Sequence, residues 1–132
     1  MDYHNDILDR FQNGIDKFNE GLYYECHDIL EDVWFDIRGS SRRFYQGLIH
    51  LAVGFHHILK RNNLKGALSQ LNKGKEKLSD YKPEFQGVEL QNLLKKIQKC
   101  IDNIKMIQDG KVEDFDFLTV PKIKFNHDLF KA

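Results

Sequence analysis

The chain contains only two prolines, Pro83 and Pro121, and its apolar residues recur at intervals of three and four over most of its length. A proline inside a helix removes a backbone hydrogen bond and clashes with the preceding turn, so long helices can form almost everywhere else. Apolar residues three and four apart lie on one face of a helix. The pattern predicts helices over residues 5–19, 23–38, 41–60, 64–78 and 88–108. We therefore expect an all-α fold of about five helices, in a single domain over residues 1–132.

The third of these segments, residues 41–60, is apolar over much of its circumference. One apolar stripe of this segment consists of Leu48, Leu51, Phe55 and Leu59. A helix with so little polar surface buries most of its circumference against its neighbours. We therefore expect this helix to lie in the centre of the bundle.

The spacing of apolar residues changes near the C-terminal end of the chain, where they alternate with polar residues. The large apolar residues of this tail are Phe115, Phe117, Val120, Ile123 and Phe125. Exposing apolar surface to water costs about 25 cal/mol per Å². We therefore expect residues 112–126 to form an extended strap that lies across the helices or across a second subunit.

The charged residues balance over the whole chain, which has a formal net charge of zero, but not within its parts. Residues 1–37 carry ten acidic and two basic residues, whereas residues 38–77 carry nine basic residues and one acidic residue. A basic block is typical of nucleic-acid binding. Because the two blocks cancel, we interpret them as helices of opposite charge that pack together, and we do not expect a nucleic-acid partner.

Two further features bear on the location of the protein. Its apolar runs are shorter than the roughly 18 residues that a membrane-spanning helix needs, and its first residues lack the pattern of a signal peptide. Cys26 and Cys100 lie within helical patterns and lack the spacing of a disulfide framework. We therefore expect a cytoplasmic protein, without a membrane segment, that has two reduced and buried thiols.

The stretch YYECHDILEDVW, residues 23–34, concentrates titratable and aromatic residues on one predicted helix. His27 and Glu31 are four residues apart and therefore share a helix face, which Trp34 extends. The other carboxylates of the stretch lie on flanking and opposite faces. A candidate site on this helix therefore consists of His27 and Glu31, with Trp34 as a wall.

The next predicted helix offers partners for this pair. Gln46, His50 and His57 share one face, and antiparallel packing would bring Gln46 and His50 opposite His27 and Glu31. Arg42 would then lie near the closed end of the pocket. His56 lies about 100° around the helix from His57, so the two are not expected to chelate one ion.

Three interpretations of this pocket remain open. Imidazole and carboxylate ligands together suit zinc, iron or manganese, which makes His27, Glu31, His50 and His57 candidate ligands of a divalent metal ion. Alternatively, Glu31 orients His27 as a general base. The third interpretation is a hydrogen-bonded polar seam without chemistry, because buried polar groups need partners. The Glu-x-x-His signature of helical di-metal proteins and the His-Glu-x-x-His signature of zinc proteases are both absent.

The two stretches FNEGLYYECHDILEDVW and RRFYQGLIHLAVGFHHILKRNNLKGALSQL resemble the bacterial family called domain of unknown function 309. Its hallmark is an aromatic-Glu-x-His-Glu-x-x-Glu-x-x-Trp helix, followed by a Phe-x-Gln-Gly-Leu-Ile helix. The positions of this chain that match the motif are Glu25, His27, Glu31, Trp34, Gln46, Gly47 and His57. The chain departs from the family at Asp28, His50 and His56, where Glu, Gln and Tyr are more usual.

The resemblance implies a helical bundle built around a three-helix core. Members of the family are sometimes labelled predicted metal-dependent hydrolases, so it also implies hydrolysis with a divalent metal ion. In such an enzyme His27 or His57 would act as base or ligand, and Glu31 as a ligand or an orienting group. Arg42 would anchor an anion, and Gln46 would complete the pocket.

A weak internal repeat suggests a different class of function. Cys26 corresponds to Ala67, and Leu30 to Leu71, at a spacing of 41 residues. Helical hairpins repeated in this way are typical of tetratricopeptide-type proteins. The alternative to an enzyme is therefore a non-catalytic interaction module that binds a protein partner or a second copy of itself.

Overall fold

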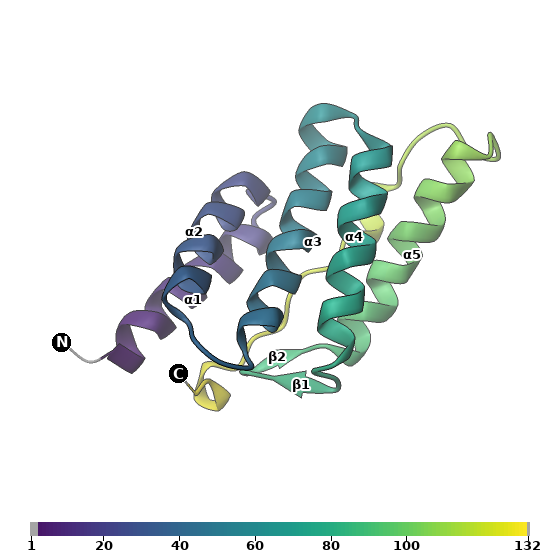
Figure 1. Cartoon of the computed structure of the whole chain (residues 1–132). Helices are drawn as coiled ribbons and strands as arrows, with labels where there is room; N and C mark the ends of the chain where they lie inside the picture. Colours follow the sequence, from purple (N-terminus) through teal and green to yellow (C-terminus); the bar gives the residue numbers. More distant parts are fainter. Residues whose placement is uncertain (1–2, 132) are drawn as a thin grey trace.

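Within residues 3–131, which the computed structural model describes, five α-helices lie side by side, each packed against the next (Figure 1). Residues 1, 2 and 132 of the expected domain lie outside the described part. The helices are α1 (Tyr3–Asn19), α2 (Tyr23–Asp36), α3 (Arg42–Arg61), α4 (Leu64–Ser79) and α5 (Gln91–Gln108). The predicted all-α fold is confirmed, with a two-stranded hairpin and two 3-10 turns as its other elements.

Short turns make consecutive helices antiparallel. Gly21 adopts a φ of +79° between α1 and α2, a conformation that glycine reaches without steric cost. Asn62 ends α3 at a φ of 47°, and the Oδ1 atom of Asn63 accepts a hydrogen bond from the Gly66 amide at 2.9 Å. Asparagine is favoured at both kinds of position, the left-handed end of one helix and the cap of the next. These turns hold α1 against α2, and α3 against α4.

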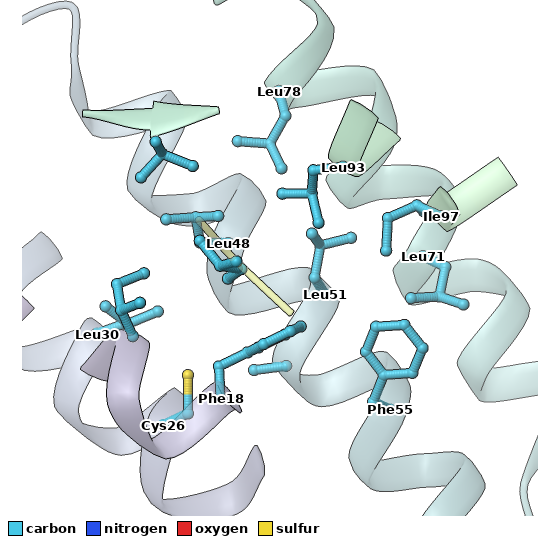
Figure 2. Packing of buried hydrophobic residues seen from close by; sticks show 14 of the residues in the cluster. Phe18, Cys26, Leu30, Leu48, Leu51, Phe55, Leu71, Leu78, Leu93 and Ile97 are labelled. Carbon is cyan, nitrogen blue, oxygen red and sulfur yellow. The ribbon is translucent and has the colours of Figure 1, made fainter. Parts of the chain in front are cut away.

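Helix α3 lies between α2 and α4, as its sequence pattern predicts. Figure 2 shows Leu48, Leu51 and Phe55 of α3 among side chains from the neighbouring helices. All three are buried, but Leu59 is 43% exposed, and Ile58 is buried in its place. The predicted stripe therefore fails in the last turn of α3, where Leu59 lines an open groove beside the start of α2.

The connection between α4 and α5 contains a hairpin of β1 (Glu84–Phe85) and β2 (Val88–Glu89). The prediction that a helix begins at residue 88 was wrong, since α5 begins at Gln91. Gln86 and Gly87 both adopt a positive φ, of 53° and 80°, which is the backbone of a two-residue hairpin turn. The Glu89 carboxylate then caps α5, because its Oε2 atom accepts a hydrogen bond from the Asn92 amide at 3.0 Å.

The C-terminal tail leaves α5, turns back and passes behind the helices towards α1 (Figure 1). It contains the 3-10 turns η1 (Phe117–Thr119) and η2 (His127–Leu129). Its buried residues are Phe115, Pro121, Ile123 and Phe130, whereas Phe117 is 52% exposed and contradicts the expectation that it docks. Phe117 faces outward because η1 replaces the predicted alternation at this point.

Two side-chain amides hold the tail in the manner of strand partners. The Asn19 side chain donates to the Ile123 carbonyl at 2.9 Å and accepts from the Ile123 amide at 2.7 Å. The Gln86 side chain likewise donates to the Lys131 carbonyl and accepts from the Lys131 amide. Between them, Phe125 forms a β-bridge with Val88.

Both cysteines are free thiols buried in the bundle. Burial raises the pKa of Cys26 to about 12, so its thiol does not ionise at neutral pH and cannot act as a nucleophile there. Among the residues that the structure describes, no helix combines the length and apolar character needed to cross a bilayer.

Candidate functional site

The contact between α2 and α3 contains two small clefts, one after the other along the helices. The first, the His27 cleft, has a volume of about 180 Å³ and is lined by Tyr23, Tyr24, His27, Val53, His56 and His57. The second, the Glu31 cleft, has a volume of about 170 Å³ and is lined by Glu31, Trp34, Gln46, Ile49 and His50. The start of α2 thus faces the end of α3, as antiparallel packing requires.

His27 lines the first cleft, and its ring is oriented by its own helix. Its Nδ1 atom lies 2.9 Å from the Tyr24 carbonyl oxygen, which can only accept, so Nδ1 carries the proton. The Nε2 atom therefore presents a lone pair, and Glu31 Oε1 lies 3.4 Å from it. Two acceptors at this distance repel each other unless a proton or a metal cation lies between them.

The His27–Glu31 separation fits a shared metal ion. Two ligands about 2.1 Å from a tetrahedral ion are about 3.4 Å apart, which is the observed distance between Nε2 and Oε1. Ligand atoms of His27, Asp28 and Glu31 lie within 4.8 Å of one another, but the Asp28 Oδ1 atom approaches the protonated Nδ1 and not Nε2. A backbone carbonyl bound to the far imidazole nitrogen is also the usual support of a metal-ligating histidine.

Asp28 was not a predicted member of the site. The helical pattern assigned it to a flanking face, but its Oδ1 atom lies 3.5 Å from His27 Nδ1. Adjacent residues on a helix diverge at Cβ, and only the side-chain rotamers bring these two together. The motif position of Asp28, next to His27, is the one sequence signal that pointed to it.

On the α3 side, His57 lines the His27 cleft, and its Nδ1 atom is buried without a hydrogen-bond partner among the described residues. A buried polar atom without a partner costs free energy, so His57 Nδ1 is a position where a water or a ligand would lower the energy of the fold. His56 also lines this cleft, although the sequence placed it on a different face. Burial raises the pKa of the neighbouring Tyr23 to about 12, so its phenol stays protonated and is no general base.

At the other end of the seam, Arg42 lies over the Trp34 ring, with its guanidinium carbon 4.1 Å from the ring centroid. This cation–π contact places a positive charge beside the Glu31 cleft. Arg42 Nε and Trp34 Nε1 are both buried without hydrogen-bond partners among the described residues. Gln46, on the same cleft, completes the group of predicted residues found there.

His50 lies on the Glu31 cleft but is already engaged by α4. Its Nδ1 atom donates a hydrogen bond to Gln70 Oε1 at 2.7 Å, a partner that the sequence analysis missed. Burial lowers the pKa of His50 from 6.5, Lys73 and Lys77 lower it further, and the Gln70 hydrogen bond opposes them. His50 is therefore a neutral imidazole at physiological pH.

A fall in pH from about 7.5 to about 5 is expected to lower the free energy of unfolding, and His50→Gln is expected to flatten this dependence. With a folded pKa below 6.5, His50 binds its proton more weakly in the folded chain than in the unfolded chain. Its stabilising contribution is therefore complete above that pH and is lost as the pH falls through the lower folded pKa. Urea unfolding at several pH values measures the slope, with His127→Gln as an exposed control. Equal slopes for His50→Gln and the wild type would contradict the assignment.

The predicted residues therefore divide between two connected clefts instead of one pocket. His27 and His57 line the first cleft, Glu31, Gln46 and His50 the second, and the His27–Glu31 contact joins them. The fold and this seam define the chain as a small all-α protein of antiparallel helices with a histidine–carboxylate seam between α2 and α3.

Comparison with known proteins agrees with the resemblance seen in the motifs. Residues 11–70 match the family model described as Domain of unknown function (DUF309). The uncharacterized protein YpuF of Bacillus subtilis (strain 168) is 44% identical over 46 residues, which are 34% of this chain. These residues cover 26%, about a quarter, of the length of YpuF. The matched family segment runs from α1 into α4 and contains the whole seam, whereas the hairpin, α5 and the tail lie beyond it.

Proposed function

We propose that the α2–α3 seam binds a divalent transition-metal ion through His27 and Glu31 and serves a hydrolytic reaction. The observation that carries the proposal is the pair of facing acceptors, His27 Nε2 and Glu31 Oε1, held 3.4 Å apart. Imidazole and carboxylate ligands suit zinc, iron and manganese. The resemblance to the domain of unknown function 309 family, whose members are sometimes labelled predicted metal-dependent hydrolases, implies the same class of function.

Several residues of the chain have separate roles at such a site. His27 and Glu31 hold the ion, and the Asp28 carboxylate beside Nδ1 adds negative charge close to it. A bound divalent ion supplies Lewis-acid activation of a carbonyl or phosphoryl group. His57 lines the same cleft and accepts or delivers the proton of the reacting water. Arg42 draws a substrate anion towards the Trp34 end.

Untagged wild-type protein is expected to contain about one zinc, iron or manganese ion per chain, and His27→Ala to contain none. His127→Ala is the matched control, because His127 Nδ1 also lies 3.5 Å from the carboxylate of the next residue. That histidine lacks a glutamate four residues later, since residue 131 is lysine. Elemental analysis after dialysis against excess metal measures the content, and circular dichroism checks that each variant folds.

A wild-type chain that retains no metal under these conditions would overturn the proposal. A proton between His27 and Glu31 would then account for their contact, and His27→Ala would lower only the melting temperature. That result would favour the second candidate function, a helical interaction module. The exposed Leu22, Tyr24 and Leu59 support this second candidate, because they gather around one open groove of about 500 Å³ at the ends of α2 and α3.

A further inference from the structure

A cleft of about 420 Å³ lies between α5 and the C-terminal tail, on a part of the molecule that the seam does not use. Four lysines line it: Lys96 and Lys99 from α5, and Lys122 and Lys124 from the tail. The lysines of α5 lie on the exposed face of the helix. Lys96 and Lys99 of α5 form one side of the cleft, and Lys122 and Lys124 of the tail form the other side.

Hydrogen bonds hold the backbone on both sides of the cleft. On the α5 side, the buried Cys100 Sγ atom donates to the Thr119 carbonyl at 3.5 Å and so ties η1 to the helix beside Lys99. On the tail side, the Lys124 carbonyl accepts a hydrogen bond from the Glu89 amide at 3.1 Å. The backbone that carries the lysines is therefore anchored on both sides of the cleft.

The charges of the cleft are not balanced by the protein. Among the described residues, none of the four lysines forms an ion pair, and no carboxylate lines the cleft. Arg10 pairs with Asp6 and Asp36, and Arg43 pairs with Asp80, whereas most lysines of the described residues lack an ion pair, and these four are the ones that line a common cleft. Like charges that face one another destabilise a fold, so a cleft of this kind gains stability when an anion enters it.

We propose that this lysine cleft binds the phosphate groups of a phosphorylated ligand. Lysine ammonium groups are strong donors to phosphate oxygens, and four of them match the charge of a polyphosphate better than that of a single carboxylate. A volume of about 420 Å³ lies within the range of small-molecule sites. Leu118 lies on the rim of the cleft and is 95% exposed. An exposed apolar side chain beside the lysines suits a lipid surface, so the phosphate has two sources, a soluble molecule and a lipid headgroup.

The proposal is tested with inorganic pyrophosphate by isothermal titration calorimetry at low salt, on the full chain. Wild-type protein is expected to bind pyrophosphate. The double substitution Lys99→Gln and Lys122→Gln is expected to raise the dissociation constant by at least about tenfold. The matched control combines Lys95→Gln with Lys105→Gln, which removes two charges from α5 at exposed positions outside the cleft. This control is expected to bind as the wild type does.

A second arm of the experiment separates the two sources of phosphate. Sedimentation with phosphatidylcholine vesicles that contain phosphatidylserine, and with phosphatidylcholine alone, tests the headgroup. Anionic vesicle binding that Leu118→Ser and the cleft variant both abolish assigns a lipid source, and pyrophosphate binding without vesicle binding assigns a soluble ligand. Absence of both kinds of binding, or an equal loss in the cleft and control variants, would overturn the proposal.

Discussion

A chain truncated after Gly110 is expected to lose at least about 5 kcal/mol of unfolding free energy, and with it most of its cooperative folding. The truncation removes the buried Phe115, Ile123 and Phe130. Burial of one large apolar side chain contributes about 1.5–3 kcal/mol, so these three approach the whole stability of an ordinary domain, about 5–15 kcal/mol. It also uncovers Phe11, whose ring centroid lies 5.1 Å from that of Phe125 and 5.4 Å from that of Phe130. Thermal and urea unfolding followed by circular dichroism measure the loss.

Leu118→Ser is the control for this truncation, because Leu118 belongs to the same tail but is 95% exposed. Its unfolding free energy is expected to stay within about 0.5 kcal/mol of the wild type. A truncated chain that melts at the wild-type temperature would show that the tail contributes nothing to the fold.

The substitution Gly74→Val is expected to destabilise the protein by about 3 kcal/mol and to lower the melting temperature by about 10 °C. A Cβ atom at Gly74 would lie 2.9 Å from the Gly47 carbonyl oxygen and 2.7 Å from Leu51 Cδ2. The first of these neighbours is backbone, so the collision is relieved only by moving α3 and α4 apart. Gly47 belongs to the family motif, and its close approach to α4 supplies a physical reason for a glycine at that position.

Ser69→Val provides the comparison for Gly74→Val, because it places the same side chain on the exposed face of the same helix. The control is expected to melt within a few degrees of the wild type, since surface substitutions usually change stability by less than about 0.5 kcal/mol. Differential scanning calorimetry compares the two variants. Similar melting temperatures for both would indicate that helix propensity, and not the α3–α4 contact, governs the response at position 74.

The helices were predictable because their signal is local. Each helix is indicated by apolar residues at helical spacing within its own segment, and the turns at Gly21 and Asn62 are indicated by a few neighbouring residues. The hairpin was missed because Val88 and Leu90 also fit a helical pattern. Pairing of Val88 with Phe85 depends on the backbone of Gln86 and Gly87, and on the distant tail.

The candidate site was predictable in part for the same reason. His27 and Glu31 are four residues apart on one helix, so the periodicity alone brings them together, and their atoms lie 3.4 Å apart. The division of the pocket into two clefts was not predictable, because it depends on how α2 is aligned with α3. Packing between the helices decides that alignment. The spacing of residues along one helix carries no information about it.

The all-α class and the pairing of His27 with Glu31 follow from the amino-acid pattern, because each depends on neighbours along the chain. Three other features depend on packing: His57 lines the same cleft as His27, Gln70 binds His50, and the lysines of α5 share a cleft with Lys122 and Lys124. These contacts join residues far apart in the sequence. Their geometry arises only when the hydrophobic core forms and brings the helices and the tail together.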